Sequence, residues 1–219
     1  KDEHKGKSWA EWEDDIRLRQ KKAMDQYTKR LKDEILFYEF QQYLFAQQWK
    51  QLKAYAKEKG KLISCDPNLR LPLWKSEEVA KEQMLWSLRQ ADVVKISDNE
   101  VEFLWGCAPE EGAQKLLEEF GVSLALVTLG PDGCLLKTKS ASFQAKCPKV
   151  HPIDTTGAGD IFGGSAMTRL LELDKPMAQL TEEDLCYIGS FAAAAASLST
   201  EHSGGIPSIQ DRETVLKAI

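Results

Sequence analysis

The sequence predicts an α/β protein, in which helices flank a Rossmann-like sheet and an α-helical segment precedes it. Residues 1–59 contain no proline and a single glycine, Gly6, which is typical of a helical region. From residue 60 onward, short apolar or β-branched runs alternate with longer helical patterns. A turn with two glycines in three residues, Gly157 and Gly159, then precedes an apolar segment with helical spacing. We therefore expect two segments, 1–59 and 60–219.

The composition indicates a globular protein without a nucleic-acid or membrane partner. The chain has 219 residues, 42% of them hydrophobic, and its 29 basic and 34 acidic residues give a net charge of −5. No basic cluster suggests a nucleic-acid surface, and no apolar run reaches the length of a membrane span. The three histidines do not cluster in the sequence, so we expect no histidine metal site.

The five cysteines indicate a reducing compartment. They are odd in number, and no two of them have the C-x-x-C spacing of zinc and redox sites. Free thiols are typical of the cytoplasm. Residues 1–4 are charged and are not typical of a signal peptide. We therefore expect a cytoplasmic protein.

The first segment contains a long helical pattern. Its apolar positions recur at steps of four and three residues, with an interruption at Gln42, and they are Leu31, Ile35, Tyr38, Phe45, Trp49, Leu52 and Ala56. A second apolar stripe makes the middle of this helix apolar on nearly every side, through Leu36, Phe40, Tyr43 and Leu44. Such a helix should be buried against the second segment or another chain. Gly60 is suited to end it.

Parts of this segment resemble 4-α-glucanotransferases (amylomaltases). The similar residues are Lys5 to Trp9 with Trp12, then Phe40 to Phe45, Gln48, Trp49, Tyr55 and Ala56. The family's catalytic carboxylates lie further along its chain and have no counterpart after Gly60, so the resemblance implies ancestry without glucanotransferase activity. The alternative, which the residue pattern alone supports, is a helical hairpin without a chemical role. We interpret the chain as a fusion of two fragments that join near Gly60.

The second segment has the following predicted elements in order. Strands are expected at residues 62–65, 92–96, 124–128 and 135–138, with a strand end at 150–153. Helices are expected from the cap Ser76 to about Gln90, from Pro109 to Phe120, from near Asp160 to Leu173 and from Thr181 to near Thr200. Ser97 and Glu100 have the spacing of a capping box.

The central turn, residues 154–160, has the sequence Asp-Thr-Thr-Gly-Ala-Gly-Asp. Gly157 and Gly159 allow the backbone to approach a ligand closely, and a helix that begins there offers free N–H groups to an anion. Asp160 could then accept a proton from an attacking hydroxyl group. A simple glycine turn with Asp160 as the helix N-cap is the alternative. Neither the dinucleotide pattern nor the Walker pattern is present.

This turn resembles the second signature of the ribokinase-like (pfkB) sugar kinases, and fructokinases in particular. The resemblance implies part of a ribokinase-like fold and transfer of the ATP γ-phosphoryl group to a sugar hydroxyl. It implies that Gly157, Ala158 and Gly159 form the anion hole and that Asp160 is the base. It also implies a monovalent cation, K⁺, near Asp154, Thr156 and the closing Gly-Gly-Ile-Pro motif at residues 204–207.

Two further motifs appear in the order of that family. Residues 66–74 match its D-P-N-x-R-x-x-L-W segment, which implies that Asn68 and Arg70 lie near the phosphates and the sugar; the alternative is a surface turn with a solvated arginine. Residues 95–100 match the region of its N-x-x-E motif, with Ser97 in the place of the asparagine. The resemblance implies that Lys95, Ser97 and Glu100 contact the nucleotide and that Glu100 organises Mg²⁺ indirectly. The alternative is a capping box alone.

A third motif borders the ATP site in the family. It is T-x-G-x-x-G, which falls on Thr128, Gly130 and Gly133. A bare hairpin would need the same glycines.

The resemblance as a whole implies a fructokinase-like kinase that uses ATP, Mg²⁺ and K⁺ and acts on a small sugar. It begins midway through the family's fold, so the half that carries most sugar contacts has no counterpart here. The alternative is therefore a catalytically silent fusion fragment that keeps at most nucleotide binding. The sequence leaves open whether the chain forms a homo-oligomer.

Overall fold

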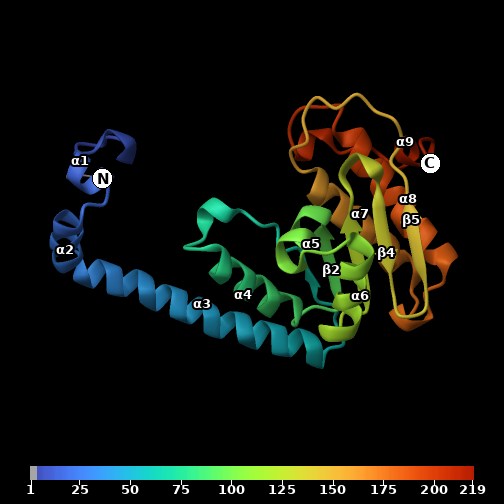
Figure 1. The fold of residues 1–219 in the computed structure, drawn as a ribbon, viewed down its shortest axis with the longest axis horizontal. Helices are drawn as coiled ribbons and strands as arrows, with labels where there is room; N and C mark the ends of the chain where they lie inside the picture. The colour runs from blue at the N-terminus through green and yellow to red at the C-terminus, as the bar shows by residue number, and fades with distance from the viewer. Residues whose placement is uncertain (1–3) are drawn as a thin grey trace. The chain divides into compact units, whose positions relative to one another are not determined.

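The computed structural model describes residues 4–219 and divides the chain into two compact units, Lys1–Gly60 and Lys61–Ile219. The prediction that no signal peptide is present rests in part on residues 1–3, which lie outside the described residues. Within the described part of the chain, no helix has the length and apolar character needed to cross a membrane. Figure 1 shows the elements of each unit.

The first unit is helical, as predicted. After a 3₁₀ turn at Trp9–Glu11, its helices are α1 Asp14–Arg17, α2 Lys21–Arg30 and α3 Lys32–Glu58. Helix α3 ends at Lys59, and Gly60 follows in the left-handed conformation with φ +61°. This is the end that the glycine predicts, because only glycine adopts that conformation without a steric penalty.

The burial of the long helix against the second segment or another chain stays a prediction. No side chain of α3 is buried, and its large apolar side chains are exposed on several sides. The exposed side chains of α3 are both aromatic and aliphatic: Leu36, Phe37, Tyr38, Phe40, Tyr43, Leu44, Phe45, Trp49, Leu52 and Tyr55. Among residues 4–60 the buried side chains are those of His4 and Ala23, which both precede α3 in the sequence.

The second unit contains a five-stranded sheet whose spatial order equals its order in the sequence. The strands are β1 Ser64–Cys65, β2 Val93–Ser97, β3 Leu124–Thr128, β4 Cys134–Lys137 and β5 Ser142–Ala145. Strands β1, β2 and β3 are parallel, and β4 and β5 follow as antiparallel hairpins. In the β2–β3 register Ser97 lies opposite Thr128, so both strands end at the same edge.

Helices cover both faces of this sheet. They are α4 Glu77–Leu88, α5 Asp98–Trp105, α6 Pro109–Glu119, α7 Ala158–Leu173, α8 Glu182–Ser199 and α9 Arg212–Leu216. The bounds of α4, α6, α7 and α8 are close to the predictions, α5 begins at the predicted capping box, and α9 was not predicted. Side-chain caps begin α4 and α8, where the hydroxyl groups of Ser76 and Thr181 accept backbone N–H groups of the first turn. Gly121 follows α6 with φ +73°.

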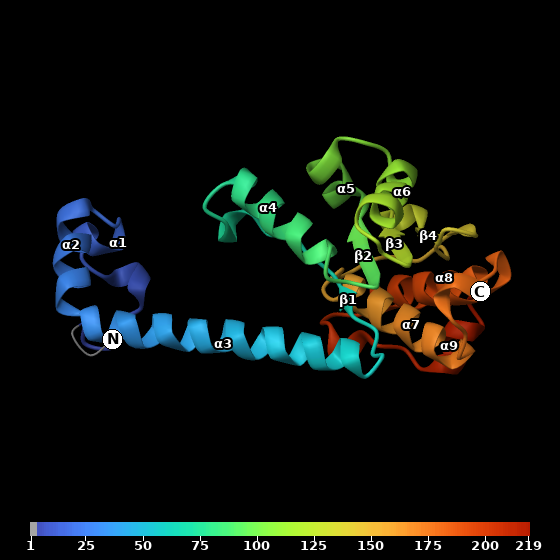
Figure 2. The same cartoon turned by 90° about the horizontal axis from the view of Figure 1, so that it is seen from below.

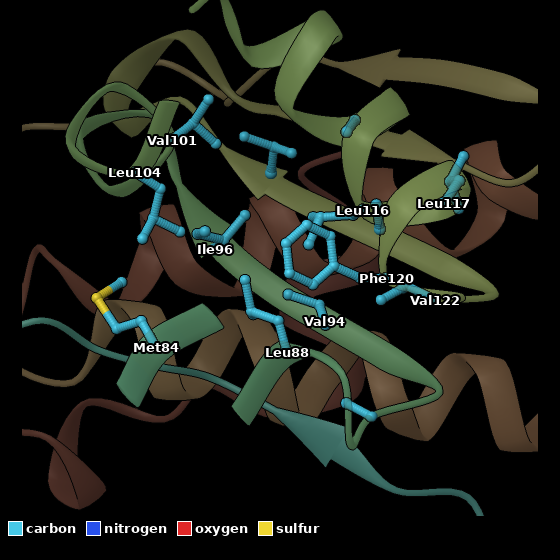
Figure 3. Packing of buried hydrophobic residues seen from close by; sticks show 14 of the residues in the cluster. Met84, Leu88, Val94, Ile96, Val101, Leu104, Leu116, Leu117, Phe120 and Val122 are labelled. Carbon is cyan, nitrogen blue, oxygen red and sulfur yellow. The ribbon is translucent and has the colours of Figure 1, made fainter. Parts of the chain in front are cut away.

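The core consists of two apolar layers, one on each side of the sheet. Val94 and Ile96 of β2 point to the layer with α4, α5 and α6, whose packing Figure 3 shows. Val93 of the same strand and Leu126 of β3 point to the layer with α7 and α8. This alternation is the period of two that a strand imposes. Figure 2 shows the two helical layers on opposite sides of the sheet, which makes the unit a three-layer α/β structure.

Around the central turn, one prediction is wrong and one alternative is excluded. Residues 150–153 form no strand, because Pro152 lacks an N–H group and the N–H groups of Ile153 and Asp154 donate to the carbonyl oxygen of Thr200 at 2.7 and 3.0 Å. Helix α7 begins at Ala158 with Gly157 as its N-cap. Asp160 is therefore the third helical residue, which excludes its interpretation as the N-cap. Strand β5 was not predicted.

The turn between β3 and β4 generates a testable prediction. Gly133 has φ +107°, and a Cβ atom there would lie 1.9 Å from the carbonyl oxygen of Ala145. Gly121 has φ +73°, and no atom lies within 4 Å of its Cβ position. We expect Gly133→Ala to lower the free energy of unfolding by roughly 3 kcal/mol or more, and Gly121→Ala by about 1–2 kcal/mol. Urea unfolding of both variants measures the difference, and equal losses would contradict this packing.

Candidate functional site

A cavity lies between the first turns of α7 and the face of the sheet that α7 covers, beside the end of β1. Its volume is about 260 Å³. It is lined by Ser64, Cys65, Asp66, Val93, Lys95, Leu126, Gly159, Asp160, Gly163, Gly164 and Met167. Ligands of open α/β sheets bind beyond the carboxyl ends of the strands. The cavity reaches that position at β1, where Cys65 and Asp66 line it. On β2 it lies along Val93 and Lys95 and does not reach the end of the strand.

The first turn of α7 offers backbone donors to an anion. The Ala158 N–H donates to the carbonyl oxygen of Thr155 at 3.2 Å, and the Ile161 N–H donates to that of Gly157 at 2.9 Å. The N–H groups between them, those of Gly159 and Asp160, have no acceptor among the described residues. Unpaired N–H groups and the positive end of the helix dipole attract an anion. These N–H groups are available to an anion, and the anion hole itself stays a prediction.

The glycines of this turn are required by close contacts. Gly157 has φ +79°, and a Cβ atom on it would lie 3.0 Å from the Cα atom of Gly205. The closing Gly-Gly-Ile-Pro motif therefore packs directly on the turn. A Cβ atom on Gly159 would lie 3.0 Å from the Nζ atom of Lys95. A larger residue at position 159 would intrude between the turn and this cation.

Lys95 brings a positive charge to the anion hole. It extends from β2 on the side of the sheet that α7 covers, and its Nζ atom donates to Oδ2 of Asp66 at 3.0 Å. The Lys95 side chain is only 12% exposed, so its charge is little screened by water. The sequence prediction of Lys95 as a ligand-binding residue is compatible with this position.

Asp66 is a site residue that the sequence analysis did not select. Burial raises the pKa of its carboxyl group, the hydrogen bond and charge of Lys95 oppose that rise, and the negative charges of Glu100 and Asp160 add to it. Three carboxylates and one ammonium group therefore share this edge of the sheet. An acidic residue directly after a strand and before Pro67 was the signal that could have revealed Asp66.

Glu100 joins the loop after β1 to the start of α5. It is buried, and one carboxylate oxygen accepts the Leu69 N–H at 2.6 Å. The other accepts the N–H and the hydroxyl group of Ser97 at 2.8 and 2.9 Å. The predicted capping box is confirmed. With three donors on its carboxylate, Glu100 has little capacity left for a metal ion, which favours an indirect contact with Mg²⁺ through water.

Asn68 and Arg70 lie on the loop after β1, and both are exposed. Asn68 has φ +46°, and the Nη1 atom of Arg70 donates to Oδ1 of Asn68 at 2.8 Å and to the carbonyl oxygen of Leu69 at 2.9 Å. The bond from the Leu69 N–H to Glu100 holds this loop beside the start of α5. Neither Asn68 nor Arg70 lines the cavity.

The third motif lies at the next strand of the sheet. Thr128 ends β3 opposite Ser97, and Gly130 and Gly133 flank the 3₁₀ turn that leads into β4. None of the three lines the cavity at Asp160. Gly133 is required by its contact with Ala145, so the hairpin alternative accounts for this glycine. A contact between these residues and a nucleotide stays a prediction.

Asp154 joins two loops beside α7. Its carboxylate oxygens accept the Thr156 N–H at 2.9 Å and the Gly204 N–H at 2.8 Å. A hydrogen bond from the side chain of Thr156 is the main cause that lowers the pKa of Asp154, and the backbone bonds from Gly204 and Thr156 add to it, so the pKa falls from 3.8 to about 2. Within residues 4–219, no group of three or more His, Cys, Asp or Glu side chains could hold a metal ion. A K⁺ site at Asp154 and Thr156 stays a prediction.

The lowered pKa of Asp154 generates a prediction about acid stability. Because the folded-state pKa lies below the unfolded-state value, the ionised carboxylate stabilises the fold above about pH 4. That stabilisation decreases as the pH falls towards 2. Asp154→Asn should therefore lower the free energy of unfolding at pH 7, and by a smaller amount at pH 3. Urea unfolding at both pH values, with Asp132→Asn in an exposed turn as the control, measures this; a loss that is equal at both pH values would contradict it.

The fold and this site define a class: three-layer α/β proteins that bind an anionic group between strand ends and a helix N-terminus. Comparison with known families matches residues 22–212 of this chain to the pfkB family carbohydrate kinases. This match covers most of the chain, and the chain therefore belongs to the pfkB family.

Curated relatives of the chain are plant fructokinases. Fructokinase-1 of Zea mays is 41% identical over 167 residues, which are 75% of this chain and 50% of the relative. Probable fructokinase-2 of Arabidopsis thaliana is 39% identical over 156 residues, 70% of this chain and 46% of the relative. The chain thus spans about half the length of the curated relatives it matches.

Solved structures of bacterial fructokinases have a similar fold. The fructokinase of Vibrio cholerae O395, described as bound to fructose, ADP and calcium ion, matches with a TM-score of 0.67 at 32% identity, over 76% of this chain and 53% of that one. The fructokinase of Xylella fastidiosa with bound ATP matches with a TM-score of 0.68 at 26% identity, over 77% and 55%. The predicted ribokinase-like sheet flanked by helices is confirmed. The resemblance of residues 1–59 to amylomaltases stays a prediction.

Proposed function

We propose that the chain carries the phosphoryl-transfer site of an ATP-dependent, fructokinase-like sugar kinase. One observation carries this proposal: the exposed carboxylate of Asp160 lies in the same helical turn as two unpaired N–H groups, beside the partly buried cation of Lys95. A base next to an anion hole suits the transfer of a phosphoryl group to a hydroxyl group.

Each residue of the turn has a distinct role in the proposed reaction. The backbone of Gly157, Ala158 and Gly159 holds the γ-phosphoryl group through the N–H groups of the helix start, and Lys95 neutralises its charge. Asp160 accepts the proton of the sugar hydroxyl as its oxygen forms a bond to the γ-phosphorus atom. The bond between that phosphorus atom and the β–γ bridging oxygen breaks, and ADP leaves. Catalysis then depends on positioning and charge more than on covalent chemistry.

The surrounding residues fit a nucleotide with its metal ion. The unpaired N–H groups and Lys95 suit the phosphates, and Asn68 and Arg70 lie on the loop that Glu100 fixes. Mg²⁺, which supplies further neutralisation of the phosphates, usually keeps several waters and binds the phosphates directly. Glu100 would orient such water molecules. Thr128, Gly130 and Gly133 would border the adenosine part, and Asp154 with Thr156 would hold K⁺.

The comparisons support fructose, or a closely related sugar, as the acceptor. The relatives at about 40% identity are named fructokinases, and one structural neighbour is described with fructose and ADP bound. The five cysteines are free, which supports the cytoplasm as the location.

A second candidate function is nucleotide binding without catalysis. The observation that favours it is β1, which lies at the edge of the sheet and has only two residues. In that case the anion hole remains and the sugar contacts do not. Glucanotransferase activity is not proposed for residues 1–59.

A pair of aspartate substitutions tests the proposed role of Asp160. Asp160→Asn should keep Mg-ATP binding and lower the rate of fructose phosphorylation by about 10²–10⁴-fold, because the general base is lost. Asp174→Asn, at the other end of α7 with φ +46°, should leave the rate unchanged, since asparagine tolerates that conformation. ADP release measured with and without fructose gives the rates.

The outcomes separate the two candidate functions. An active chain whose rate survives Asp160→Asn would contradict the assignment of the base. A folded chain that binds Mg-ATP and produces no fructose-dependent ADP would establish the second candidate in place of the first.

A further inference from the structure

The long helix of the first unit has a regular apolar face that the proposed function does not use. Its residues recur at alternating steps of four and three, and they are Leu31, Ile35, Tyr38, Gln42, Phe45, Trp49, Leu52 and Ala56. We call this set the α3 seam. Every position except Gln42 is apolar. A mean step of 3.5 residues is the repeat of two helices that wind around each other in a left-handed pair.

The α3 seam is exposed to solvent. Tyr38 is 65% exposed, Phe45 61% and Leu52 57%. The rings of Phe45 and Trp49 stack at 6.0 Å with an interplanar angle of 18°, so they form one continuous aromatic surface near the middle of the helix. Large contiguous apolar patches are rare on monomeric proteins and mark interaction surfaces. The seam therefore requires a partner.

The size of the helix matches what a dimer needs. Helix α3 has 27 residues, and at 1.5 Å per residue such a helix is about 40 Å long. If about a third of its circumference is covered, two copies bury roughly 1,000 Å² together, which reaches the lower range of specific protein interfaces.

The distribution of charged residues along α3 favours one kind of partner. The first half of α3 carries Asp33, Glu34 and Glu39 against one base, Lys32, and is net acidic. The second half carries Lys50, Lys53 and Lys57 against one acid, Glu58, and is net basic. A second copy in antiparallel orientation places each acidic half beside a basic half, and it also opposes the two helix dipoles. We propose that the α3 seam pairs with the α3 seam of a second copy of this chain, in antiparallel orientation.

The residues that flank the seam favour the same orientation. Glu39 and Lys53 occupy equivalent flanking positions two heptads apart. In an antiparallel pair centred near Gln47, Glu39 of each copy lies beside Lys53 of the other, and Trp49 packs on Phe45 of the other copy. In a parallel pair, Glu34 of each copy would lie beside Glu39 of the other, which brings like charges together.

Matched substitutions on two faces of α3 test the pairing in the full chain. Phe45→Glu places a charge in the seam, and Phe40→Glu places the same charge on the opposite face, where Phe40 is 55% exposed. Light scattering after size-exclusion chromatography, at protein concentrations of about 1–100 μM, measures the mass. We expect a dimer for the unchanged chain and for Phe40→Glu, and a monomer for Phe45→Glu. Circular dichroism should show unchanged helix content.

A charge exchange tests the orientation. Glu39→Lys and Lys53→Glu should each weaken the dimer by about tenfold or more, and the double variant should recover most of the affinity, because the opposed pairs are restored. A monomer throughout that concentration range would overturn the proposal, and the second unit of the same chain would then be the partner of the seam. Loss of the dimer in Phe40→Glu alone, or single charge variants without effect, would equally overturn it.

Discussion

The contact between Lys95 and the start of α7 determines how the candidate site can work. Gly159 has no side chain, so the Nζ atom of Lys95 can lie 3.0 Å from the position that a Cβ atom would take. Asp66 holds this Nζ atom through a hydrogen bond of 3.0 Å. Parallel pairing of β1 and β2 brings Asp66 and Lys95 to one edge of the sheet. The close packing of Gly157 on Gly205 brings the helix start to the same edge. A cation, a base and free N–H groups thus meet at one cavity, although they come from distant parts of the chain.

Features that depend on neighbouring residues were predictable from the sequence. The caps at Ser76 and Thr181 and the capping box of Ser97 and Glu100 are present, because each is a hydrogen-bond pattern within a few residues. Gly60 ends its helix with a positive φ for the same local reason. Buried strands such as β3 were predictable since all their side chains are apolar or β-branched. The family resemblance then added the roles of the residues in the central turn.

Features that depend on distant contacts were not predictable. The pair of Asp66 and Lys95 joins residues 29 positions apart, and no local pattern indicates it. Residues 150–153 have β-branched residues, yet they bond to Thr200 because no strand is available beside them. Strand β5 has little strand propensity and forms because β4 offers its edge. The partner of α3 was not predictable either, since the sequence shows a need for burial without showing the partner.

The central claim is that the start of α7 and Lys95 bind the phosphates of ATP. Isothermal titration of the folded chain with Mg-ATP tests it most directly, with the Lys95→Met, Asp66→Asn double variant as the comparison, because that variant leaves no buried carboxylate unpaired. The account predicts saturable binding that the double variant weakens by about tenfold or more, since a charge-assisted contact is lost. Binding that strengthens when fructose is added would show that the sugar site is also present. No heat with the folded chain, or equal affinity in the double variant, would contradict the account.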